Sequence, residues 1–221
     1  MNFFRHFFAK TLTKRKFCDI IAKNSRFVGL GLQFPDRDRP ESRGQTAMNT
    51  KNNNVIVSEA EIKEKIAQVA EQVSKEYAGK PLLLVSILKG AFIFMADFCR
   101  ALTIPCEIGF MCAKSYYSST VSSGEVTITL DLDQDISNYH VIIVEDILDT
   151  GRTLSLVVEN LKQRNPLSLK VVTLLDKPSR RLVNFEADIS LFTIPDHFVV
   201  GYGLDCDEKY RNLPYVAEYQ G

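Results

Sequence analysis

The chain has 221 residues, of which 45% are hydrophobic and 24% charged, a composition typical of a soluble globular protein with one domain and an appendage, or two small domains. The 27 Lys/Arg balance the 27 Asp/Glu, but residues 1–54 hold 11 basic and 4 acidic side chains and the remainder 16 and 23. An acidic main body argues against general nucleic-acid binding, and no apolar run reaches the ~18 residues of a membrane span.

The five cysteines form no CxxC pair, and their number is odd. They are Cys18, Cys99, Cys106, Cys112 and Cys206. This pattern favours a reducing compartment and disfavours a zinc site.

Residues 1–34 are rich in Phe, Lys and Arg and contain one acidic side chain, Asp19. This composition is typical of an organelle transit peptide, whereas the apolar core of a secretory signal is missing. Residues 35–54 have the polar composition of a linker. The alternative is that the protein starts at Met48, which predicts a cytoplasmic location instead of an organellar one. Both readings place residues 1–54 outside the fold and leave 55–221 as the folded domain.

The domain is predicted to begin with a helix. Ser58 and Glu61 form a capping box, and apolar residues recur at helical spacing up to Tyr77. A buried strand is predicted at 81–88, and 91–102 read as a buried helix that is apolar nearly all round.

Two further strands are predicted at 104–111 and 125–132, the second with its apolar side chains on one face. The intervening 114–124 contain five serines and one threonine and have little to bury. This segment is either a solvated hairpin loop or a lid.

The chemical centre of the chain is 141–154, with the sequence VIIVEDILDTGRTL. Its β-branched start suits a strand buried on both faces. Gly151 frees the backbone of the following loop, and a helix starting near Arg152 would point unpaired N–H groups at an anion such as phosphate. Glu145 and Asp146 would repel that phosphate unless they bind vicinal hydroxyls or a cation. The alternative is an ordinary strand-to-helix loop with solvated acids.

A helix at 153–161 and strands at 169–175 and 187–194 follow, before an irregular, aromatic C-terminal segment. Strands that alternate with helices predict a parallel sheet covered on both faces, with ligands at the carboxyl ends of the strands. Three polar sets lie at such ends and are expected to share one crevice: Lys89-Gly90, 145–153 and Lys177.

VIIVEDILDTGRTL resembles the phosphoribosyl pyrophosphate (PRPP) motif of the type I phosphoribosyltransferases. Taken with LVSILKGAFIFMADFCRAL, KSYYSS, VVTLLDKPSRR and IPDHFVVGYGLDCDEKYRNLPY, it makes the chain similar to the bacterial-type hypoxanthine-guanine phosphoribosyltransferases over about 55–216. The resemblance implies an α/β fold, with a twisted, mostly parallel sheet flanked by helices, a small hood and a mobile loop.

The resemblance also implies a purine salvage transferase. In that reaction N9 of hypoxanthine, or of guanine, displaces pyrophosphate from C1 of PRPP, giving IMP or GMP. The implied cofactor is Mg²⁺, and the implied partners are PRPP, a 6-oxopurine and further copies of the chain in a homodimer or homotetramer, with no nucleic acid and no membrane.

The same resemblance assigns roles to individual residues. Asp149 is the catalytic acid/base that handles the proton at purine N7. The implied contacts of PRPP and its phosphates are Glu145, Asp146, Asp149, Thr150, Gly151, Arg152, Thr153, Lys89, Gly90 and Arg211, with Arg152 at a variable, peripheral position and a cis Leu88–Lys89 peptide. The implied purine contacts are Lys177, Phe198, Val199 and Asp205. The implied Mg²⁺ ligands are Glu145, Asp146 and Asp205, and the mobile loop contains Ser115 and Tyr116.

The chain departs from the family pattern at Cys206, where an aromatic residue is usual. His140 and His197 match no catalytic position and are expected to be solvated or locally hydrogen-bonded. Two other functions stay open: a regulatory protein that keeps the fold to bind nucleotide and RNA, and a xanthine-preferring salvage enzyme.

Overall fold

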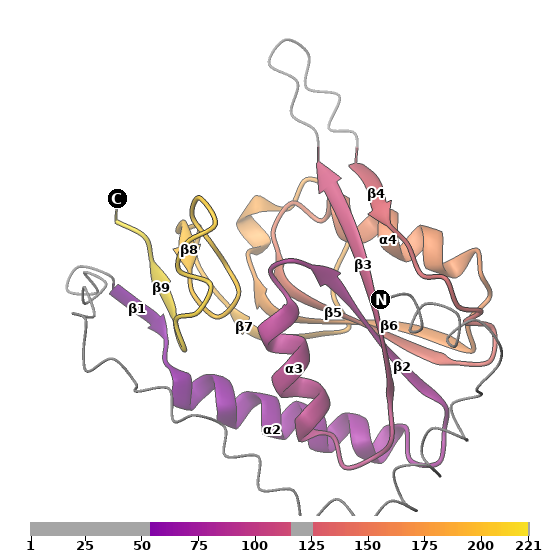
Figure 1. Ribbon diagram of the computed structural model, residues 1–221. Coiled ribbons are helices and arrows are strands. Elements are labelled where there is room, and N and C mark those ends of the chain that lie inside the picture. The colour runs from indigo at the N-terminus through magenta and orange to yellow at the C-terminus, as the bar shows by residue number, and fades with distance from the viewer. Residues whose placement is uncertain (1–53, 116–125, 221) are drawn as a thin grey trace, which may run out of the picture. The chain divides into compact units, whose positions relative to one another are not determined.

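The computed structural model describes residues 54–115 and 126–220, except for the side chains of Lys114 and Ser115 (Figure 1). The predictions for residues 1–53 and for the loop that contains Tyr116 lie outside these residues. Nothing in the two described ranges is a helix of the length and apolar character that a membrane crossing requires.

Helices and strands alternate along the first part of the described chain, up to the third strand, and again around the last α-helix. The helices are α2 (Glu59–Glu76), α3 (Phe92–Ala101) and α4 (Arg152–Lys162), with a 3₁₀ turn η2 (Pro178–Arg180). The strands are β1 (Asn54–Val57), β2 (Leu82–Leu88), β3 (Glu107–Ser115), β4 (Val126–Leu130), β5 (His140–Leu148), β6 (Ser168–Asp176), β7 (Ile189–Thr193), β8 (Val199–Val200) and β9 (Val216–Glu218).

Six strands form one sheet in the order β4-β3-β2-β5-β6-β7. All neighbours are parallel except β3 and β4, which confirms the predicted, mostly parallel sheet. Alternate residues of β2 enter two apolar cores: Leu82 and Leu84 pack in the core that contains α2 and α3, and Leu83 and Val85 pack in the core that contains α4. Helices therefore cover both faces, which explains why β2 is apolar throughout.

The capping box is present: Glu61 N–H donates to Ser58 Oγ (3.3 Å) and Ser58 N–H to Glu61 Oε2 (2.8 Å). The prediction of an all-round buried 91–102 helix is wrong, since Phe92 is 44% exposed. Leu130 is also exposed (48%), because β4 is the edge strand of the sheet.

A small antiparallel sheet, β1-β9-β8, forms the hood and joins the first described strand to the last (Figure 1). Its attachment to α3 includes Tyr202, whose hydroxyl donates to Asp97 Oδ2 (2.6 Å). The hood therefore stands next to the loop that connects β2 to α3, where Gly203 lies so close to the Gly90 carbonyl that a Cβ would be 1.9 Å from its oxygen.

Candidate active site

A pocket of about 270 Å³ opens at the carboxyl ends of β2 and β5 and at the start of α4. Because β2, β5 and β6 are adjacent and parallel, the polar residues that follow them reach the same edge of the sheet. The predicted site residues that line the pocket are Gly90, Glu145, Asp146, Asp149, Thr150, Gly151 and Thr153.

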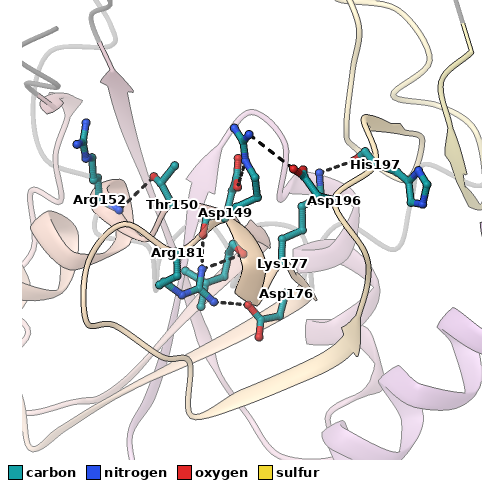
Figure 2. Close-up of polar contacts among 10 residues, drawn as sticks. Asp149, Thr150, Arg152, Asp176, Lys177, Arg181, Asp196 and His197 are labelled. Carbon is teal, nitrogen blue, oxygen red and sulfur yellow. Dashed lines mark hydrogen bonds and ion pairs between the residues drawn. The ribbon is translucent and has the colours of Figure 1, made fainter.

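The loop between β5 and α4 has the geometry of an anion cradle. Helix α4 starts at Arg152, and its N-cap is Gly151, which has φ 82° and provides no side-chain cap. Any other residue there would be strained, and its Cβ would lie 2.9 Å from Val183 Cγ2. The positive end of the helix dipole therefore lies at this loop, where Thr150 Oγ1 accepts a hydrogen bond from the Arg152 N–H (3.4 Å; Figure 2). The Arg152 side chain is exposed and lies outside the pocket lining.

The Arg181 side chain contacts the backbone at the start of this loop (Figure 2). Its guanidinium donates to the carbonyls of Leu148 (3.1 Å) and Asp149 and pairs with Asp176. Leu182 N–H donates to the Thr150 carbonyl (3.0 Å). Arg181 was not among the predicted site residues, since its partners are distant in sequence and no local period reveals them.

Asp149 lies at the pocket wall with its carboxylate half-exposed. Arg180 Nε donates to Asp149 Oδ1 (3.2 Å), and the same guanidinium lies 3.8 Å from Asp196 Oδ2 (Figure 2). Asp149 is therefore oriented by a cation while its carboxylate stays accessible to a ligand.

The two acids at the end of β5 differ from surface carboxylates. Glu145 is only 8% exposed, and its Oε2 has no hydrogen-bond partner among the described residues. Burial and then the charge of Asp146 raise the pKa of Glu145 well above its usual range. Burial raises the pKa of Asp146 to about 6. A Cβ on Gly90 would lie 1.6 Å from Asp146 Oδ2, so this approach requires glycine.

A buried, unpaired carboxylate oxygen such as Glu145 Oε2, with a second carboxylate next to it in Asp146, fits a cation or vicinal hydroxyls. Within 54–115 and 126–220 no group of three His, Cys, Asp or Glu side chains could hold a metal by itself. The acids nevertheless suit Mg²⁺, which usually takes one or two carboxylates together with substrate phosphate oxygens and water.

Lys177 follows β6 and is buried. Its Nζ donates to the His197 carbonyl (2.5 Å), and its backbone N–H donates to the Leu148 carbonyl (2.9 Å), which ties it to the end of β5. Phe198 is 58% exposed beside this lysine's partner, and Val199 is buried in β8. The lysine, the exposed ring and the β8 backbone thus stand on the hood side of the cradle.

A chain of charges joins the β2–α3 loop to the hood. Lys89 Nζ lies 2.9 Å from Glu208 Oε1, and Arg211 contacts both Glu208 Oε2 (3.1 Å) and Asp205 Oδ1 (2.8 Å). Hydrogen bonds from Lys89 and Arg211 lower the pKa of Glu208. The two cations predicted to bind pyrophosphate therefore share one carboxylate, Glu208, which the sequence did not single out.

The remaining expectations have mixed outcomes. The Leu88–Lys89 peptide is cis, as the resemblance implied. His140 Nδ1 lies 2.8 Å from Ser168 Oγ and His197 Nδ1 2.6 Å from Glu218 Oε1, so both histidines are locally bonded as predicted. Ser115 ends β3, while Tyr116 lies outside the described residues.

Comparison with known proteins gives consistent matches. The family model described as the phosphoribosyl transferase domain matches residues 54–207. The hypoxanthine phosphoribosyltransferase of Salmonella typhimurium is 49% identical over 166 residues, which cover 74% of this chain and 93% of the relative. The hypoxanthine-guanine phosphoribosyltransferase of Streptococcus pneumoniae is 49% identical over 163 residues, covering 74% and 91%.

Solved structures of the same family are also similar to this chain. The crystal structure of a hypoxanthine phosphoribosyltransferase from Staphylococcus aureus has a TM-score of 0.72 and 46% identity, covering 76% of this chain and 91% of that one. The structure of a hypoxanthine-guanine phosphoribosyltransferase from Bacillus anthracis has a TM-score of 0.71 and 41% identity, covering 75% and 98%. The chain therefore belongs to the phosphoribosyltransferase family, within its hypoxanthine phosphoribosyltransferase branch, and has the type I fold of that family.

Proposed function

We propose that this chain is a purine salvage enzyme that transfers the 5-phosphoribosyl group of PRPP to hypoxanthine, and to guanine, with release of pyrophosphate. The observation that carries this proposal is one pocket that combines the start of α4, the two acids Glu145 and Asp146 and the half-exposed Asp149. The buried Lys177 is tied to the same end of β5 through its hydrogen bond to the Leu148 carbonyl. The similarity to named hypoxanthine phosphoribosyltransferases supports the choice of substrates.

In the proposed complex, the 5′-phosphate of PRPP accepts hydrogen bonds from the first-turn N–H groups of α4 and from Thr150 and Thr153. Glu145 and Asp146 bind the ribose hydroxyls, and Lys89 and Arg211 bind the pyrophosphate. When bound, Mg²⁺ would be held by Glu145, Asp146 and Asp205 together with PRPP oxygens and would neutralise charge on the departing pyrophosphate.

The purine enters on the hood side. Lys177 donates to O6, Phe198 stacks on the ring and the Val199 backbone meets the purine edge. As N9 attacks C1 and the bond from C1 to pyrophosphate breaks, the Asp149 carboxylate accepts the proton from N7. An ammonium at O6 selects against adenine, whose exocyclic amine would meet it donor to donor.

The test is turnover by the purified full chain with hypoxanthine, PRPP and Mg²⁺, measured as release of pyrophosphate and formation of IMP. Guanine, xanthine and adenine are compared in parallel. Turnover that is highest with xanthine would change the proposed substrate. Absence of turnover with all four bases, together with RNA binding, would favour the regulatory alternative.

Lys177→Ala is expected to raise the KM for hypoxanthine by about 10-fold or more and to reduce discrimination against adenine, because a charged hydrogen bond to O6 is lost. The measurement is the kcat/KM ratio for hypoxanthine and adenine. Lys162→Ala, an exposed lysine of α4, is the control. An unchanged ratio would place O6 recognition elsewhere.

Glu208→Gln is expected to lower the KM for PRPP by about 2–5-fold, because Lys89 and Arg211 no longer have to exchange a carboxylate for pyrophosphate. Asp207→Asn, which removes an exposed acid of the same loop, is the control. A higher KM for PRPP in Glu208→Gln would instead mean that Glu208 orients Arg211 for catalysis.

We also propose a homodimer or homotetramer in the cytoplasm, with the N-terminal extension outside the folded domain as far as residue 53, because Asn54, which the sequence assigned to the extension, begins β1. Light scattering of the purified chain measures its mass in solution. Mass spectrometry of the native N-terminus tests the proposed location. A start at Met48 would agree with the cytoplasm, and cleavage near residue 34 would indicate an organelle.

A further inference from the structure

The last residue of β9, Glu218, contacts His197, whose carbonyl binds Lys177, and the next residue, Tyr219, packs against Phe198. We propose that Glu218 and Tyr219 are positioning residues for the base: Glu218 sets the position of Lys177 through His197, and Tyr219 sets the position of the Phe198 ring. This inference rests on the proposed function and adds determinants of purine affinity that the resemblance did not assign.

The first arm runs from β9 to the lysine. His197 is held on two sides, since its Nδ1 lies 2.6 Å from Glu218 Oε1 and its N–H donates to the Pro195 carbonyl (2.8 Å). The carbonyl of this same residue accepts the hydrogen bond from Lys177 Nζ (2.5 Å; Figure 2). An ammonium has three N–H donors, so one bond to a fixed carbonyl aims the other two. The Glu218 carboxylate therefore controls where the buried lysine points.

The second arm runs from β9 to the ring. Tyr219 N–H donates to the Phe198 carbonyl (2.8 Å), which extends the pairing of β8 with β9 by one residue. The two rings meet edge to face, with centroids 5.8 Å apart and planes at 70°. This arrangement is the preferred one for aromatic pairs, and it fixes the tilt of a ring that is otherwise 58% exposed.

Tyr219 is itself held in place. The Tyr210 ring packs against it with centroids 5.7 Å apart and planes at 56°. The Cys206 thiol is close enough to raise the pKa of the Tyr219 hydroxyl. Cys206 is the position where an aromatic residue is usual in the family. In this chain the ring that packs against Phe198 is that of Tyr219, one residue past β9.

The experiment measures steady-state kinetics of the full chain carrying Glu218→Ala or Tyr219→Val. Each substitution is expected to raise the KM for hypoxanthine about 3–10-fold, because a misplaced hydrogen bond or stacking partner weakens base binding. The KM for PRPP and kcat are expected to stay within about 2-fold. Tyr219→Phe keeps the ring and is expected to keep the wild-type KM, and Glu159→Ala, an exposed acid of α4, is the control.

Double substitutions separate positioning from general support of the hood. Glu218→Ala is expected to add no further increase in KM in a Lys177→Ala background, yet to keep its effect in a Phe198→Leu background. Tyr219→Val is expected to show the reverse dependence. If Glu218→Ala does not fold, His197→Ala removes the same contact from its other side.

Several outcomes would overturn the inference. They are an unchanged KM for hypoxanthine in both variants, a parallel rise in the KM for PRPP with a lower melting temperature, and effects that add fully in every background. Failure of the wild-type chain to use any purine would instead overturn the proposed function. If the wild-type chain does turn over purines and the variants give any of these three results, only the inference about Glu218 and Tyr219 is overturned.

Discussion

Asp149→Asn is expected to lower the turnover of hypoxanthine by about 10²–10⁴-fold while the protein stays folded. The substitution removes the proposed proton acceptor for purine N7 but changes little volume. The asparagine carbonyl can still accept the hydrogen bond from Arg180 Nε that now reaches Asp149 Oδ1 at 3.2 Å. The geometry of the cradle is thus expected to survive, and the KM for PRPP to change far less than kcat.

The chain offers a matched control in Asp196→Asn. Asp196 is the other carboxylate near Arg180, at 3.8 Å, and it does not line the pocket. If a disturbed Arg180 were the cause of lost activity, both substitutions would lower kcat. A near-normal kcat in Asp149→Asn would remove Asp149 from the proposed acid/base role.

The parts of the fold that depend on local sequence were predictable. The two residues of the Ser58–Glu61 capping box are only three positions apart, and the apolar, β-branched start of 141–154 favours a buried strand, so both were recognised. The β3 prediction, 104–111, is less accurate because β3 runs from Glu107 to Ser115. Pro105, which has no N–H to donate to a neighbouring strand, lies before its start.

Contacts between distant segments were not predictable from periodicity. The pairing of β1 with β9 joins the two ends of the described chain, and Arg181 reaches the Leu148 and Asp149 carbonyls more than thirty positions away. Hydropathy also could not reveal that Phe92 faces outward, because exposure depends on what packs against α3.

The candidate site also has parts that the local sequence predicted and parts that it did not. The anion cradle followed from Gly151 and a helix start at Arg152, both of which the structure contains. The assignments of Phe198 and Arg211 came only from the resemblance, because an isolated aromatic residue and a lone arginine carry no local signal. Glu208, Glu218 and Tyr219 contact Lys89, His197 and Phe198, neighbours that only the fold brings together.

Asp146→Asn is expected to stabilise the ligand-free protein above neutral pH and to weaken PRPP binding. Burial raises the pKa of Asp146 to about 6 from an ordinary 3.8. The native state therefore favours the protonated form, and the stability linked to this group is full below about pH 4 and lost as the pH rises through about 6. Asparagine stays neutral throughout and can still accept the Ile147 N–H that Asp146 Oδ1 now accepts at 2.8 Å.

The expected gain at pH 8 is about 1–3 kcal/mol in the free energy of unfolding, the upper value corresponding to the full pKa shift of about two units. Loss of the Asp146 charge also relieves its repulsion of Glu145, whose pKa is raised partly by that charge. Denaturant unfolding of both proteins at pH 5 and pH 8 measures the difference, which is expected to be larger at pH 8.

The same substitution is expected to raise the KM for PRPP by on the order of 10²-fold, because it removes a carboxylate of the proposed ribose and Mg²⁺ site. Glu159→Gln, which neutralises an exposed acid of α4, is the control and is expected to change neither quantity. A stability difference that is the same at pH 5 and pH 8 would mean that Asp146 does not titrate in this range. An unfavourable buried carboxylate is expected where a ligand compensates for its cost, and PRPP is the proposed ligand of Asp146. A stabilised variant that keeps the wild-type KM for PRPP would therefore show that the Asp146 carboxylate does not serve PRPP binding.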